Sequence, residues 1–169
     1  MYSLPPVNRS VKEGVTENNS IKLDVKARDF ENLLYLFYDA PYEWLPTVVD
    51  SAIPMWESVL HLADMFDMHE VKVVALHALG RPGALADVHK IALYNEYGIA
   101  RSWANSAFTR VCTRTDALTG DEIAELKPAT AAVLRRAREA LLRGMKLGTK
   151  AHTAERIQEV VNKNFMVSG

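Results

Sequence analysis

The pattern of apolar and polar positions divides the chain into a short polar lead, one strand and a series of helices. Residues 1–20 are mostly polar and contain two prolines, several asparagines and serines and one glycine, which is typical of a loop. Ile21, Leu23 and Val25 then alternate with charged residues, which predicts a short, half-buried strand. A single strand cannot stabilise itself, so this strand requires a sheet partner.

Every later element is predicted to be helical. Apolar residues recur at helical spacing over residues 28–38 and again over 54–80. The second stretch starts at Pro54, which a first helical turn tolerates, and is predicted to be a helical hairpin. Its second helix is expected to start near Asp67, because Asp67 and Glu70 have the spacing of a capping box. The remaining apolar stripes predict helices at about 85–97, 103–111, 133–145 and 151–164, and a short segment opened by the capping box of Thr119 and Glu122.

The stretch HLADMFDMHE, residues 61–70, contains five side chains of the kinds that bind metals or transfer protons. Only residues three or four positions apart share a helix face, and His61 and Asp64 are the pair that meets this rule. The same stretch also supplies the core stripe, through Leu62, Ala63 and Phe66. We therefore predict no metal site here, and we interpret His61, Asp64, His69 and Glu70 as the solvated side of the hairpin.

Other candidate catalytic motifs fail on their spacing. The stretch GMKLGTK, residues 144–150, differs from a phosphate-binding loop in its glycine spacing, in the order of Thr and Lys and in following a helix. Cys112 has no patterned histidine partner, and no Gly-x-Ser-x-Gly elbow is present. The sequence thus predicts neither an enzyme nor a cofactor site.

A basic run near the C-terminus leaves an alternative function open. It consists of Arg135, Arg136, Arg138, Arg143, Lys146 and Lys150. Such a face over residues 135–150 could bind nucleic acid or a membrane surface in a small all-helical module. We favour a solvated helix face, because the arginines are expected opposite the apolar stripe and Glu139 interrupts them.

Composition and charge narrow the choice of class. The chain has 169 residues, of which 49% are hydrophobic and 24% charged, with a net charge of −1, so no global field attracts it to nucleic acid or anionic lipid. A single cysteine excludes an internal disulfide, which is compatible with an intracellular location in the cytoplasm or nucleus. No apolar run reaches the roughly 18 residues of a membrane helix, and the N-terminus lacks a signal-peptide profile.

Two stretches resemble the C-terminal half of a BTB/POZ domain: IKLDVKARDFENLLYLFYDAPYEW, residues 21–44, and WESVLHLADMFDMHEVKVVALHAL, residues 56–79. The family pattern is a strand, a helix with a Phe-x-x-Leu-Leu-x-x-x-Tyr motif and a helical hairpin. Residues matching it are Ile21, Leu23, Val25, Phe30, Leu33, Leu34, Tyr38, Leu60, Ala63, Phe66, Met68 and Val71. Residues 85–139 resemble the helical extension of BTB proteins from mushroom-forming fungi, at Ile91, Tyr97, Gly98, Trp103, Arg114, Leu118, Glu122 and Ala137-Arg138-Glu139.

The resemblance implies a mainly α chain: the C-terminal part of an α+β BTB/POZ fold, with one short strand plus helices, over residues 1–80, and a BACK-like helical extension over residues 84–169. The first third of the family's domain has no counterpart here, since MYSLPP resembles the end of the helix that normally follows its first strands. The partners of the predicted strand would lie in that part. We therefore expect uncovered apolar surface on the strand and on residues 28–38.

Membership of this family implies protein–protein interaction, homodimerisation and, in some members, binding to a cullin-type ubiquitin ligase scaffold. The missing part contains most of the family's dimer surface, which puts homodimerisation in doubt. Val11 and Glu13 fit a hydrophobic-x-Glu contact that some members use. Together with Tyr42 and Trp44 of a later loop, they are the candidate partner-binding residues, and the expected function is that of a non-catalytic interaction module.

Overall fold

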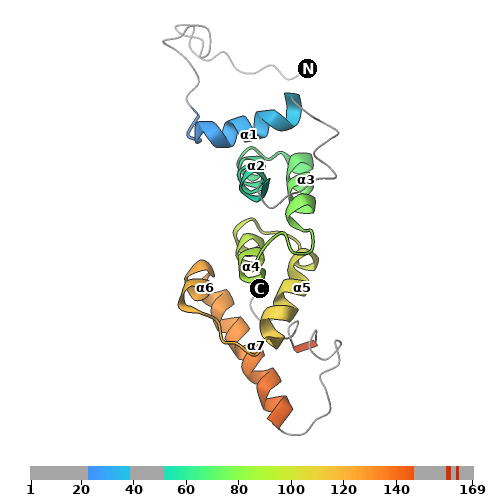
Figure 1. Ribbon diagram of the computed structural model, residues 1–169, viewed down its shortest axis with the longest axis vertical. Helices are drawn as coiled ribbons and strands as arrows, with labels where there is room; N and C mark the ends of the chain where they lie inside the picture. The colour runs from blue at the N-terminus through green and yellow to red at the C-terminus, as the bar shows by residue number, and fades with distance from the viewer. Residues whose placement is uncertain (1–22, 39–51, 147–158, 161–162, 164–169) are drawn as a thin grey trace, which may run out of the picture.

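The computed structural model describes residues 23–38, 52–146, 159–160 and 163, with side chains as far as residue 143 in the long stretch. Within these ranges the chain is mainly α and forms seven helices and no strand. They are α1 (Ala27–Tyr38), α2 (Ile53–Met65), α3 (His69–Leu79), α4 (Asp87–Glu96), α5 (Arg101–Thr113), α6 (Gly120–Glu125) and α7 (Pro128–Lys146). The helices are stacked along one long axis, from α1 at one end to α7 at the other (Figure 1).

The predicted strand is wrong for the part of it that the structure describes. Leu23 to Val25 are an irregular lead into α1, and Ile21 lies outside the described residues. A strand needs a neighbour that takes up its backbone hydrogen bonds, and the described residues contain none. Val25 instead packs on the helices that follow, while Leu23 is exposed.

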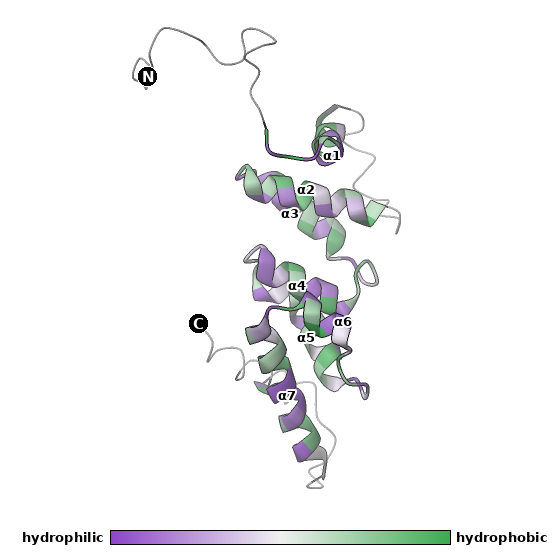
Figure 2. Ribbon diagram, turned by 90° about the vertical axis from the view of Figure 1, so that its left-hand side faces the viewer, coloured by the Kyte–Doolittle hydropathy of each residue, from purple (hydrophilic) through white to green (hydrophobic). Residues whose placement is uncertain are grey.

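Helices α1, α2 and α3 share one apolar core. The predicted hairpin over 54–80 is confirmed as α2 and α3, with α1 packed across α2. The buried members of this core are Leu33, Leu36, Trp56, Val59, Leu60, Leu62, Ala75, Ala78 and Leu79. Figure 2 shows α1 as a separate layer beside the α2–α3 pair.

The turn between α2 and α3 differs from its prediction. Asp67 does not cap α3; it has a φ of +54° and follows α2 as the left-handed residue of a Schellman motif. The N–H of Met68 donates to Ala63 O at 2.7 Å, and the N–H of Asp67 donates to Asp64 O at 3.3 Å. Asp tolerates this conformation better than most residues do. Phe66, predicted in the core stripe, sits at the C-cap and is exposed.

Helices α4 to α7 enclose a second apolar core, built mainly around Ile91, Phe108, Val111 and Leu134. The predicted helices of this region are confirmed, and so is the capping box of Thr119 and Glu122 at the start of α6. α7 begins earlier than predicted, with Pro128 in its first position. Of the predicted helix over 151–164, residues 159, 160 and 163 are described, and they are helical.

The two cores touch where α3 and α5 meet. Leu93 of α4 belongs to the α1–α3 core, and Trp103 of α5 packs against both cores. Polar contacts reinforce the junction, since the Trp103 indole donates to Leu76 O at 2.8 Å and Lys90 Nζ donates to Gly80 O at 3.0 Å. No helix in the described ranges has both the length and the apolar content needed to cross a bilayer.

Candidate interaction surface

Helix α1 carries apolar side chains on two faces. One face packs against α2, with Leu33 and Leu36 buried and Phe30 half-buried. The other face is exposed and consists of Leu34, Tyr35, Phe37 and Tyr38, which we call the α1 outer face. Phe37 is 50% exposed and Tyr38 is 79% exposed. The predicted exposure of apolar surface over residues 28–38 is thus confirmed, although the predicted single stripe divides into a buried and an exposed part.

The orientation of the α1 outer face is set by contacts on the opposite side of the helix. Ser58 of α2 donates a hydrogen bond from its hydroxyl to Asp29 Oδ1, with 2.7 Å between the oxygens. Leu33 and Leu36 are buried in the same core as Trp56 and Leu60 of α2. These contacts fix the rotation of α1 about its axis. The α1 outer face therefore points away from the core.

The charges of α1 indicate which class of partner is suited to the α1 outer face. After Arg28 the helix contains no lysine or arginine, and its ionised side chains are Asp29 and Glu31. Phosphate groups of nucleic acids and lipids require cations for binding. Large aromatic and aliphatic side chains without cations are instead typical of protein interfaces.

The residues predicted for partner binding cannot be compared with this surface. Val11, Glu13, Tyr42 and Trp44 all lie outside the described residues. The resemblance alone predicts exposed apolar surface over residues 28–38, because helical spacing identifies apolar residues without showing which of them a neighbour covers.

The histidine-rich stretch of α2 and α3 is solvated, as predicted. His61, Asp64, His69 and Glu70 are all exposed. Asp64 forms an ion pair with Lys72 at 2.5 Å, and His61 lies beside the Tyr97 ring in an edge-to-face arrangement. Among the described residues, no group of three His, Cys, Asp or Glu side chains is arranged to hold a metal ion.

His89 forms a cluster that sequence reasoning missed. Its Nε2 lies 2.7 Å from Glu57 Oε1 of α2, and its Nδ1 contacts Glu125 Oε1 of α6. Burial alone would lower the pKa of His89, but hydrogen bonds and charge interactions with Glu125 and Glu57 outweigh burial and raise it. The three residues are 32 and 36 positions apart in sequence, so no local pattern relates them. The His89 imidazole and its two carboxylate partners thus connect α2, α4 and α6.

The predicted basic face is divided by the fold. Arg138 was expected to be solvated with the other arginines, but it is buried and points toward the C-terminal end of α5. Arg135 and Arg143 are exposed and both lie beside Glu139, at 3.3 and 3.7 Å. The side chains of Lys146 and Lys150 are outside the described set. In the described part of α7, therefore, the positive charge is smaller and less continuous than the sequence predicts.

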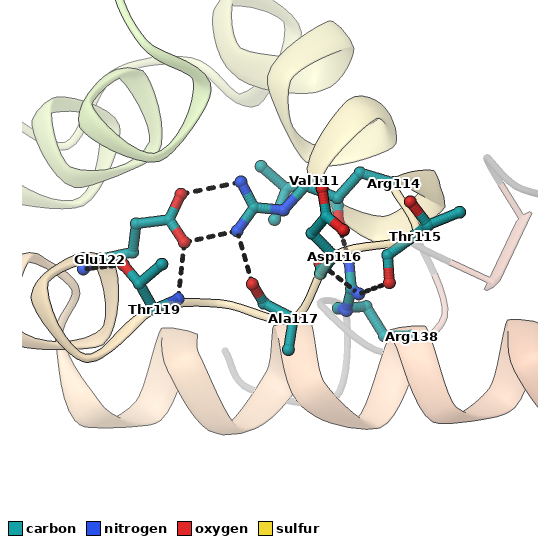
Figure 3. A network of polar contacts seen from close by, with 8 residues as sticks. All are labelled: Val111, Arg114, Thr115, Asp116, Ala117, Thr119, Glu122 and Arg138. Carbon is teal, nitrogen blue, oxygen red and sulfur yellow. Dashed lines mark hydrogen bonds and ion pairs between the residues drawn. The ribbon is translucent and has the colours of Figure 1, made fainter.

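A network of polar contacts, buried at Arg138 and partly exposed at Glu122, fixes the loop between α5 and α6 (Figure 3). Arg138 donates to Val111 O at 2.5 Å and to Asp116 O at 2.7 Å. Arg114 grips both carboxylate oxygens of Glu122, at 2.7 and 2.5 Å, and the N–H of Thr119 donates to Glu122 Oε2 at 2.8 Å. These contacts, with Arg114 first, lower the pKa of Glu122 to about 2. The loop is consequently fixed at both ends.

Cys112 is not arranged as a nucleophile. It is buried in the α4–α7 core, and burial raises the pKa of its thiol to about 11. A thiol in this state is protonated near neutral pH and behaves as a small apolar side chain.

Comparisons with models of known families, with curated proteins and with solved structures yield no significant match.

Proposed function

We propose that the chain is a non-catalytic protein–protein interaction module of the BTB/POZ type and that a partner protein covers the α1 outer face. The observation that carries the proposal is the exposure of Leu34, Tyr35, Phe37 and Tyr38 on a helix whose opposite face is firmly packed. Tyrosines beside aliphatic side chains are typical of the few residues that contribute most of the binding free energy at an interface.

The adaptor role follows from the sequence motif and not from the described helices. Val11 and Glu13 have the hydrophobic-x-Glu form that some BTB proteins use to contact a cullin-type ubiquitin ligase scaffold. We therefore propose that scaffold as the partner class. On this proposal the Val11 and Glu13 contact and the α1 outer face contribute to one interface.

Binding of the full chain to a purified cullin N-terminal region tests the proposal. We expect saturable binding by calorimetry and at least a roughly tenfold loss of affinity in Leu34→Glu/Phe37→Glu, because both changes place a charge in a desolvated contact. Val11→Ala/Glu13→Ala is expected to weaken binding as well.

Val73→Glu provides the matched control, since Val73 of α3 is an exposed apolar residue away from α1. Val73→Glu would place a charge in the interface only if the interface extended to α3. We therefore expect this variant to bind with unchanged affinity. Circular dichroism confirms that each variant is folded. Absence of binding by the unaltered chain contradicts the adaptor assignment, and equal losses in Val73→Glu and the α1 variant contradict the α1 interface.

A further inference from the structure

A second exposed apolar surface lies at the opposite end of the molecule from α1 (Figure 1). It is a groove of about 700 Å³ between α7 and the segment that runs from Thr115 to Ile123. Leu118, Ile123, Ala131 and Leu142 supply most of its apolar lining. Ile123 is 48% exposed and Leu142 is 52% exposed, so both project from the wall instead of joining the core.

The wall of this groove is fixed in place before any partner arrives. Arg138 holds the carbonyls of Val111 and Asp116, and Arg114 holds Glu122 (Figure 3). The capping box at Thr119 fixes the start of α6 next to Ile123. A preformed groove loses little entropy on binding, which favours a specific ligand over transient contact.

The rim of the groove is positively charged. Arg135 has a side chain that is 82% exposed, and Arg136 beside it is also exposed. Glu139 offsets one of these charges through its contact with Arg135 at 3.3 Å. Among the described residues Arg136 has no carboxylate within ion-pair distance. A net positive rim around an apolar floor complements a ligand with apolar side chains and flanking carboxylates.

We propose that this groove binds an amphipathic, acidic helix of a partner protein. The lining residues of α7 extend from Ala131 to Leu142, which corresponds to about three turns and about 16 Å. A helix satisfies its own backbone, whereas an extended peptide would need backbone partners from the groove. Such partners are scarce, because Arg138 and Arg114 already occupy the carbonyls of Asp116 and Ala117.

The proposal adds a second surface to the proposed interaction module and depends on no residue of α1. The groove could therefore bind its helix even if the α1 outer face binds nothing. Nucleic acid is disfavoured as the occupant because the floor is apolar and Glu139 lies among the arginines.

Fluorescence anisotropy with synthetic peptides tests the groove in the full chain. The probes are amphipathic peptides of about 14 residues, long enough for about four helical turns. One has leucines on one face and glutamates beside them, and the second has lysines in place of the glutamates. We expect the acidic peptide to bind about tenfold more tightly than the lysine peptide, because only its charges complement the rim.

Variants locate the binding and distinguish it from the α1 surface. Arg135→Glu/Arg136→Glu and, separately, Leu142→Asp are each expected to weaken the acidic peptide about tenfold. Arg28→Glu is the matched control, since Arg28 is an exposed arginine of α1 that does not line the groove, and it should change affinity by less than about twofold. Leu34→Glu/Phe37→Glu should also leave peptide binding unchanged.

Several outcomes would overturn the proposal. The proposal is wrong if the two peptides bind with equal affinity or if the acidic peptide shows no saturable binding. It is also wrong if Arg135→Glu/Arg136→Glu leaves the affinity for the acidic peptide unchanged. Tighter binding of a single-stranded oligonucleotide or of phosphatidylserine vesicles through the same arginines would overturn it in favour of a phosphate-binding surface. Loss of binding in the α1 variant alone would place the peptide on the α1 outer face.

Discussion

Gly80, the C-cap of α3, lies against the Trp103 side chain of α5. A Cβ built at Gly80 would lie 2.8 Å from Leu76 O and 2.9 Å from Trp103 Nε1. These two atoms are hydrogen-bonded to each other at 2.8 Å, so neither moves without loss of that bond. Glycine is required here by lack of space, since its φ of −74° is available to any residue.

We expect Gly80→Ala to lower the free energy of unfolding by about 1–3 kcal/mol, through forced displacement of the Trp103 indole. Urea denaturation measures the change. Gly120→Ala is the control, because nothing lies within 4 Å of a Cβ at Gly120. An equal loss in both variants would show that the effect of Gly80→Ala does not come from this close contact.

His89 makes stability depend on pH in a defined direction. Its pKa in the folded chain is raised above the ordinary value of 6.5, because the contacts with Glu125 and Glu57 outweigh the effect of burial. A group with a raised pKa stabilises the fold fully below its unfolded pKa, and this contribution disappears as pH rises through the folded pKa. The window therefore starts near 6.5 and extends upward.

We expect the free energy of unfolding to fall as pH rises through this window and His89→Gln to flatten the profile. Denaturant titrations at a series of pH values measure both chains. His77→Gln serves as control, because His77 is an exposed histidine of α3, and it should retain the profile of the unaltered chain. A profile of the unaltered chain that rises over the same range would contradict the inferred direction.

At the scale of elements, residue spacing within a few positions predicted the helices correctly. The predictions that failed concern features that depend on contacts between distant parts of the chain. The α2–α3 hairpin and the Thr119 capping box follow from spacing within a few residues, and both are confirmed. Asp67 fits two roles locally, as an N-cap of α3 or as the left-handed residue that ends α2, and the structure uses the second. The strand failed because strand formation depends on a neighbour elsewhere in the chain.

The candidate surfaces also depend on contacts that residue spacing does not reveal. A helical wheel places Arg138 near the other arginines, but the carbonyls that hold it belong to residues 111, 115 and 116. The burial of Arg138 and the divided faces of α1 both depend on which helices pack together. Sequence periodicity identifies an apolar face, but it does not determine whether a neighbour covers that face.

Arg138 acts as a side-chain cap for the C-terminal end of α5. Cations are favourable at this end of a helix, where carbonyls lack partners. We expect Arg138→Met to lower the free energy of unfolding by about 2–4 kcal/mol, because it removes charged hydrogen bonds and leaves Val111 O buried without them. Thermal and urea unfolding give the change.

Arg136→Met isolates the role of Arg138, since it removes an exposed arginine of the same helix and should cost about 0.5 kcal/mol or less. Arg138→Lys keeps the charge and should recover part of the loss. A loss in Arg138→Met no larger than in Arg136→Met would show that the cap contributes little.

At the scale of the whole molecule, the two cores form one structure through a small junction. Trp103 packs against both cores, and Leu93 of α4 enters the α1–α3 core. Polar contacts also cross between the two groups of helices, among them Trp103 to Leu76 O, Lys90 to Gly80 O, Lys72 Nζ to Tyr97 O at 3.1 Å and His89 Nε2 to Glu57 Oε1 at 2.7 Å. The junction lies where the sequence predicts the boundary between residues 1–80 and 84–169, a division that stays a prediction.

The small junction makes the cooperativity of unfolding sensitive to Trp103. The Trp103 indole donates to Leu76 O, and the Lys90 ammonium lies 4.7 Å from the centre of its ring. Trp103→Phe removes the indole donor and leaves Leu76 O with the backbone bond from the N–H of Gly80, so the loss is that of one hydrogen bond, about 0.5–1.5 kcal/mol. That cost falls on contacts between the cores, whereas contacts within each core remain.

We therefore expect hydrogen exchange to separate the two cores in Trp103→Phe. In the unaltered chain, the most protected amides of α2 and α5 should share one opening free energy, which is typical of a single cooperative unit. In the variant, the amides of α1 to α3 and those of α4 to α7 should open at different free energies, because a contact that couples the two cores is weakened. Phe108→Leu, a change inside the α4–α7 core, should lower both values together. If Trp103→Phe also lowers both values equally, the junction is not the weak point, and the helices fold as one unit from α1 to α7.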